Sequence, residues 1–369
     1  MTIYIVLFVI ITIALTCSRD KTANKLNQNY RYGLFYFCTA VLTFFACVRH
    51  YNVGQDTSAY ISLFYAFGSV PWSNIISFLR ASGYEFGYIL YSKILYSLFP
   101  YRQTITVANS LLFAIFTYKF MRKYSKDCIV SLYIFYAFGF YQTSFNIVSS
   151  LIAAMMMYAN LDAFQKKNKL KAIMVTFLAF SFHRASILLI ILFLIERISL
   201  TKWRAFLVLI LAAVCAVFYQ TVLPVISFLA PDEYQGYIYA EHGDNGLILV
   251  FHLLIIVYLA FFKYMLKKKR MLSEEKAFLP NTINWLVLLE IFCFIISLRV
   301  SKFSRVAYMF TPAYFIYIPE LIDEVKGYFN RVFLRTSIFA LIGAQFFLRL
   351  SINNIGNTIP YWFMWQFRH

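Results

Sequence analysis

Charged residues are scarce in this chain of 369 residues: Asp, Glu, Lys and Arg make up only 14% of it, whereas 61% of its residues are hydrophobic. This balance excludes a soluble globular domain. Apolar stretches of about 20 residues, the length that crosses a bilayer as a helix, recur along the whole sequence with no soluble domain between them. We therefore predict a polytopic, all-α integral membrane protein in which residues 1–369 form a single domain.

Several motifs are also missing. No Asp-x-Asp and no Cys-x-x-Cys occurs, and neither His nor carboxylate residues show convincing metal-ligand spacing. The six cysteines therefore look like small buried apolar residues. No basic run lies beside exposed aromatics, which argues against nucleic acid as a partner despite the net charge of +18. No basic segment precedes the first apolar stretch, residues 1–16, so we interpret it as a retained span and not as a cleaved signal peptide.

Most of the 34 basic residues fall in six clusters, at residues 19–31, 119–126, 166–171, 197–204, 263–276 and 326–335. Cytoplasmic loops of membrane proteins accumulate Lys and Arg, so all six clusters belong in the cytoplasm. Threading the chain through them gives about twelve spans and places both termini outside. The predicted spans are 1–17, 31–48, 104–121, 128–145, 147–164, 171–183, 185–197, 204–222, 247–266, 282–298, 306–321 and 336–352.

One segment does not fit a simple loop, because residues 49–103 must begin and end on the outer side although parts of them are apolar. Two amphipathic helices in the outer interface, near residues 59–70 and 86–99, would satisfy this requirement. Pro71 and Gly83 would break the chain between them. A second outer loop is predicted at residues 231–246.

The remaining basic residues lie near the outer surface, where membrane insertion does not require them. Burying one costs on the order of 2.5 to 3.5 kcal/mol, and few acids are present outside to pair with them. Four arginines lie beside other polar groups at the ends of predicted spans: Arg49, Arg184, Arg299 and Arg305. Guanidinium binds phosphate oxygens in a bidentate manner, so we predict that these four bind a diphosphate. For Arg80, Arg349 and Arg368 we favour the simpler role of reaching to outer-leaflet head groups.

The stretch RHYNVGQDTSAY, residues 49–60, resembles the R-Y-x-V-G-x-D-x-x-x-Y signature of the EpsG-like family of Wzy-type polymerases, which assemble O-antigen and exopolysaccharide. Similar segments follow in the family's order: YEFGYIL from Tyr84, LAFSFHRASIL at 178–188, FSRVAYMFTPAYFIYIPEL at 303–321 and NIGNTIPYWF at 354–363. There are two departures. Ser149 and Ser150 stand where the family has Arg and Gln, and Phe86 replaces a proline after Glu85.

The resemblance implies a fold similar to the GT-C class of glycosyltransferases, in the bacterial inner membrane with its active site facing the periplasm. The donor would be a growing glycan on undecaprenyl diphosphate, and the acceptor would be the outer sugar of one lipid-linked repeat unit. Membrane lipids and a chain-length regulator are further expected partners. We expect no cofactor and no metal, since arginines would stabilise the leaving diphosphate.

Transfer also needs a group that accepts the proton of the attacking sugar hydroxyl, and such help is typically worth about 10²- to 10⁴-fold in rate. Asp56, Glu85 and His183 are the outward polar candidates. Each has a structural alternative. Asp56 could cap a helix that starts near Thr57, Glu85 could pair with Arg80 or cap the second interfacial helix, and His183 could be a satisfied core histidine.

Two other functions stay open from the sequence. An O-antigen ligase would use the same donor and the same arginines, although the order of the motifs favours a polymerase. A flippase for the lipid-linked sugar would be expected to show internal repeats and ionisable groups at the midplane. We find no repeat, and only Glu290 lies centrally in a predicted span, where we expect it to pair with one of the arginines.

Overall fold

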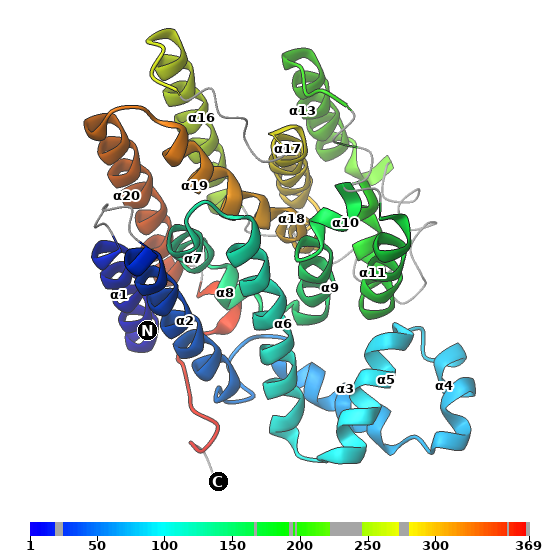
Figure 1. The fold of residues 1–369 in the computed structure, drawn as a ribbon. Helices are drawn as coiled ribbons and strands as arrows, with labels where there is room; N and C mark the ends of the chain where they lie inside the picture. Colours follow the sequence, from blue (N-terminus) through cyan, green and yellow to red (C-terminus); the bar gives the residue numbers. More distant parts are fainter. Residues whose placement is uncertain are drawn as a thin grey trace. The chain divides into compact units, whose positions relative to one another are not determined.

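The computed structural model describes residues 1–18, 25–165, 168–191, 195, 198–221, 246–272, 280–352 and 354–366. Regular structure in these residues is helical (Figure 1), and they contain no β-strand beyond isolated bridges. The chain divides into two compact units, one of Met1–Leu189 with Phe346–His369 and one of Ile190–Gln345. The prediction of an all-α membrane protein agrees with this architecture, and the single membrane domain stays a prediction.

The first unit is built around three helices of which every residue is buried: α7 (Cys128–Ala137), α8 (Phe140–Thr143) and α9 (Val148–Tyr158). The helices around them are α1 (Thr2–Cys17), α2 (Lys25–Cys47), α6 (Arg102–Tyr124), α10 (Leu161–Gln165) and α11 (Lys169–Phe182). Among these, α6 packs on α2 and α9, α11 packs on α9, and α1 packs on α7. Burial on all sides explains why α7 and α9 are apolar around their whole circumference.

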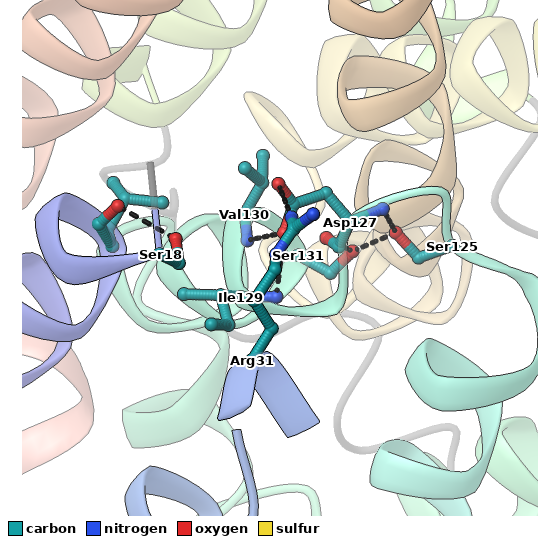
Figure 2. Close-up of polar contacts among 8 residues, drawn as sticks. Ser18, Arg31, Ser125, Asp127, Ile129, Val130 and Ser131 are labelled. Carbon is teal, nitrogen blue, oxygen red and sulfur yellow. Dashed lines mark hydrogen bonds and ion pairs between the residues drawn. The ribbon is translucent and has the colours of Figure 1, made fainter. Parts of the chain in front are cut away.

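The start of α7 is determined by Asp127 (Figure 2). Its Oδ1 atom accepts hydrogen bonds from the backbone N–H groups of Ile129 and Val130, each at 3.2 Å, as an N-cap carboxylate does. Its Oδ2 atom lies 2.6 Å from Nη2 of Arg31, which comes from α2. This contact joins the basic cluster 19–31 to the residue that follows the basic cluster 119–126, both of which we assign to the cytoplasmic side.

The end of α7 is determined by Gly139, which has a left-handed φ of +71°. The carbonyl of the preceding Phe138 accepts a hydrogen bond from the Arg349 guanidinium. Arg349 is only 2% exposed, so the expectation that it reaches to head groups is wrong. The buried carbonyl at the helix end needs a donor, and Arg349 supplies one. Arg368 lies outside the described residues.

The predicted interfacial segment contains α3 (Thr57–Ser69), a 3₁₀ turn η1 (Trp72–Asn74), α4 (Ile75–Ala81) and α5 (Phe86–Leu98). Of these, α3 and α5 match the predicted pair of helices, and the breaks fall at Pro71 and Gly83 as expected. The short α4 between them is an addition to the prediction. Lys93 of α5 is 5% exposed and donates to the carbonyl of Gly68 at 2.6 Å, which closes the end of α3 against α5.

The second unit contains α13 (Lys202–Val217), α16 (Gly246–Lys268), α17 (Pro280–Ser297), α18 (Phe303–Phe310), η3 (Thr311–Ala313) and α19 (Tyr314–Glu324). The last long helix, α20 (Tyr328–Ile352), begins in this unit and ends in the first. Within the second unit α17 packs on α13, α16 and α18. The predicted outer loop 231–246 lies outside the described residues apart from Gly246, which begins α16.

Three of the described helices are long and apolar enough to cross a membrane: α6, α16 and α20. Shorter apolar helices cover Thr2–Cys17, Cys128–Ala137, Val148–Tyr158 and Asn281–Ser297. Several predicted spans are divided, because 128–145 contains α7 and α8, and 306–321 contains parts of α18 and α19 with η3 between them. The count of about twelve spans therefore stays a prediction.

Candidate functional site

The loop that carries the family-like motif, residues 48–56 between α2 and α3, pairs with a segment near the C-terminus. We call it the motif loop, and residues 354–366 the C-terminal segment. The N–H of His50 donates to the carbonyl of Trp362 at 2.8 Å, and the N–H of Met364 donates to the carbonyl of Val48 at 2.8 Å. These bonds form an antiparallel bridge between Arg49 and Phe363. Two segments from opposite ends of the sequence thus form one structure.

Arg49 of the motif loop is 3% exposed. Its guanidinium donates to the carbonyl of Ala46 and to Oγ of Ser110 at 2.8 Å, and it lies 4.4 Å from the centre of the Phe145 ring. A small pocket adjoins it, lined also by Tyr118 and other residues of α2, α6 and α9. No carboxylate is among the contacts that the structure describes for Arg49. A permanent cation buried without an acid needs such carbonyl, hydroxyl and aromatic contacts.

Three of the predicted site residues meet at one point of the first unit, namely Glu85, His183 and Arg184. The Nδ1 atom of His183 lies 3.2 Å from Oε1 of Glu85. The same oxygen accepts the backbone N–H of Arg184 at 3.2 Å. The Arg184 guanidinium donates to the carbonyl of Gly83 at 2.5 Å, so it holds the turn that precedes Glu85. The structure therefore joins YEFGYIL and LAFSFHRASIL, two of the motifs that carry the family resemblance.

The close approach of α5 and α11 makes this meeting possible. A Cβ atom on Gly87 would lie 2.2 Å from Oγ of Ser181, so only glycine fits there. The Phe182 ring packs against that of Tyr91, with centroids 5.4 Å apart. Glu85, which immediately precedes α5, therefore faces His183, which immediately follows α11.

The pKa of Glu85 depends on two opposing effects. Its carboxylate is 9% exposed, and burial alone would raise its pKa. The hydrogen bond and charge of His183, together with the Arg184 N–H, outweigh that effect and hold the pKa of Glu85 below its ordinary value. The His183 side chain is 21% exposed. The alternative that Glu85 pairs with Arg80 is wrong, and Glu85 makes no side-chain capping bond to α5.

Asp56 occupies the N-cap position of α3 and is half-buried. Its side chain makes no capping hydrogen bond to the helix, so capping does not account for this carboxylate. The neighbouring Thr57 hydroxyl instead donates to the carbonyl of Val53 at 2.8 Å.

The other two predicted arginines belong to the second unit. Arg299 follows α17 and Arg305 lies in the first turn of α18, and both are exposed. Lys302 lies between them at the N-cap position of α18. A turn with these basic side chains would suit an anionic ligand, and their role stays a prediction.

Glu290 does not pair with an arginine, and that prediction is wrong. Its Oε2 atom lies 3.1 Å from Nδ1 of His252 in α16, and its Oε1 atom accepts the hydroxyl of Thr311. Glu290 is 0% exposed and His252 is 1% exposed. His252 was absent from the predicted site residues, although an ionisable residue within a second apolar stretch was the available signal.

The described residues contain no group of three or more His, Cys, Asp or Glu side chains that could hold a metal ion. The described helices thus include three candidate membrane spans, and a carboxylate–histidine pair links the predicted interfacial segment to His183. Comparison with family models narrows the class of protein further, because the EpsG family model matches residues 32–363.

The chain belongs to the EpsG family, which is associated with polysaccharide biosynthesis and with glycosyltransferase-like polymerases of the membrane. Searches of curated proteins and of solved structures gave no match.

Proposed function

We propose that this protein is a Wzy-type polymerase of the bacterial inner membrane. It would transfer a growing glycan from undecaprenyl diphosphate to the outer sugar of a lipid-linked repeat unit, at a site facing the periplasm. Family membership supports the class of reaction. The observation that carries the chemistry is the pair formed by Glu85 and His183, with 3.2 Å between carboxylate and imidazole.

A carboxylate next to a histidine prepares the ring for general-base catalysis. Glu85 faces Nδ1 of His183, which leaves Nε2 to accept a proton from a sugar hydroxyl. The negative charge of Glu85 stabilises the imidazolium that results, as the carboxylate does in other acid–histidine pairs. Asp56 is the second candidate for this role, since its carboxylate is not used to cap α3.

The reaction forms one bond and breaks another. The acceptor hydroxyl oxygen bonds to the anomeric carbon of the donor glycan, the bond from that carbon to the diphosphate oxygen breaks, and the hydroxyl proton passes to His183. Undecaprenyl diphosphate leaves with the electron pair. Its developing negative charge needs fixed cations, which act without a metal in this proposal.

The arginines are the proposed cations. Arg184 adjoins the pair in the first unit. Arg299 and Arg305 are exposed in the second unit, Arg299 after α17 and Arg305 in the first turn of α18, and their contact with the diphosphate stays a prediction from the sequence. Arg49 is also proposed as a diphosphate contact, although its guanidinium is held inside the first unit by Ser110 and Ala46.

Deletion of the gene, followed by electrophoresis of the surface glycan, tests the proposal. Loss of a polymerase leaves single repeat units attached to their final acceptor. Loss of a ligase leaves none attached, and loss of a flippase traps the units inside the cell. An unchanged ladder of chain lengths would contradict polymerase activity.

A further inference from the structure

The turn before Asp56 is held from two sides by segments distant in sequence. From one side, the N–H of Gly54 donates to the carbonyl of Asn357 at 3.1 Å, and the N–H of Gln55 donates to the carbonyl of Gly356 at 2.9 Å. From the other side, the carbonyl of Phe145 lies 3.3 Å from the Thr57 hydroxyl, which shares its proton between this carbonyl and that of Val53. The residues on either side of Asp56 in the chain are thus fixed, and its own side chain is not used by the helix that follows.

Two glycines make this junction possible, and the side chain of Asn146 lies next to both. Gly54 has a φ of +98°, and a Cβ atom on it would lie 3.1 Å from Oδ1 of Asn146. Gly356 has a φ of +60°, and a Cβ atom on it would lie 1.7 Å from Nδ2 of Asn146. No real Cβ contact is so short, so any side chain at residue 356 must displace Asn146 or the C-terminal segment itself.

We propose that the C-terminal segment is a positioning element of the active site, which acts through Gly356 and Asn357 to present the carboxylate of Asp56. This inference rests on the proposed function, because it assigns Asp56 a place at the reaction. It goes further in making the last residues of the chain part of the site. Without the two carbonyls, the Gly54–Gln55 turn loses both of its described bonds to the C-terminal segment, and the backbone that carries Asp56 loses this support.

The simpler role for this segment is that of an aromatic anchor in the membrane interface. Its exposed Met364 and Trp365 fit an anchor. Gly356 and Asn357 do not, because their carbonyls face the motif loop and their backbone is left-handed, with φ of +60° and +55°. An anchor needs no such geometry, since it depends on side chains alone.

Amide hydrogen exchange of the full-length protein in detergent, resolved at single residues, tests the proposal before any assay of activity. In the wild type the amides of Gly54 and Gln55 should exchange slowly, because both are hydrogen-bonded to the C-terminal segment. In Gly356→Ala they should exchange at least about tenfold faster, while α6 and α9 keep their protection. Gly33→Ala is the matched control, since a Cβ there meets nothing within 4 Å. Fast exchange at both amides in the wild type would overturn the proposal.

An activity assay then distinguishes a positioning role of the C-terminal segment from a purely structural one. In a polymerisation assay with lipid-linked repeat units, Gly356→Ala should lower kcat by about tenfold or more with KM nearly unchanged, as expected when a reacting group is displaced but substrate still binds. A rise in KM with kcat unchanged, or full activity despite fast exchange at Gly54, would contradict the role. Should the wild type itself not polymerise, the proposed function fails, while the exchange result still decides whether the segment holds the turn.

Discussion

The Nδ1 atom of His183 lies 3.2 Å from Oε1 of Glu85, and this contact joins α11 to α5. If His183 is the base of the transfer, Glu85→Gln should lower the rate by about 10²- to 10⁴-fold, because a neutral amide does not stabilise the imidazolium. His183→Gln should do the same. Polymerisation of lipid-linked repeat units by purified protein measures the effect. Arg80→Gln is the control, since Arg80 is exposed in α4, shortly before Glu85. An equal loss of activity in that variant would point to general damage.

The same pair predicts how stability depends on pH. The pKa of Glu85 is lower in the folded protein than its ordinary value of 4.5, so its charge contributes stability that is fully present above that ordinary value. This contribution is lost as the pH falls through the lowered pKa of the folded state. Thermal unfolding of wild type and Glu85→Gln should therefore differ at pH 7 and converge on acidification. A constant difference between the two at all pH values would contradict the pairing.

Arg49 and Arg305 should behave differently although both are predicted to bind the diphosphate. Both alanine variants should abolish polymerisation while the protein still inserts in the membrane. Arg49→Ala should also lower the free energy of unfolding, by about 1–3 kcal/mol, because it leaves buried acceptors without their donor. Arg305→Ala should leave it unchanged, since Arg305 is exposed. Thermal unfolding measures the difference in stability between the two variants, and electrophoresis of the surface glycan measures their activity. Full activity in both variants would contradict the predicted diphosphate site.

Much of this architecture could be predicted from hydropathy, because apolar length and basic clusters are local properties of the chain. The predicted starts of spans near residues 104, 128, 147 and 247 lie within two residues of helix starts in α6, α7, α9 and α16. The breaks inside predicted spans were missed. Gly139 ends α7 in the middle of an apolar run, and no local pattern indicates that Arg349 supplies the donor for the buried carbonyl of Phe138.

The candidate site was predictable as a set of residues but not as a geometry. Asp56, Glu85 and His183 each stood out as polar groups near span ends. Glu85 contacts His183 and not Arg80 because α5 and α11 pack closely at Gly87. This packing depends on two helices together, so the sequence of either one does not reveal it. The pairing of the motif loop with the C-terminal segment joins the two ends of the chain, so spacing along the sequence does not reveal it.

The buried pair of Glu290 and His252 gives a last prediction, which concerns stability and not catalysis. Both side chains are at most 1% exposed, and the hydroxyl of Thr311 also donates to the carboxylate. Removal of one partner takes a buried hydrogen bond away from the other, which typically costs about 1–3 kcal/mol.

His252→Ala and Glu290→Ala should therefore both lower the unfolding temperature strongly, and the double variant should be less destabilised than the sum of the two. The matched control is Glu324→Gln, which breaks the partly exposed contact to Lys263 at 3.5 Å and should cost less than about 1 kcal/mol. Unfolding in detergent, followed by intrinsic fluorescence, measures all four variants. Additive effects of the two alanine changes would show that the residues contribute independently, against the pairing seen in the structure.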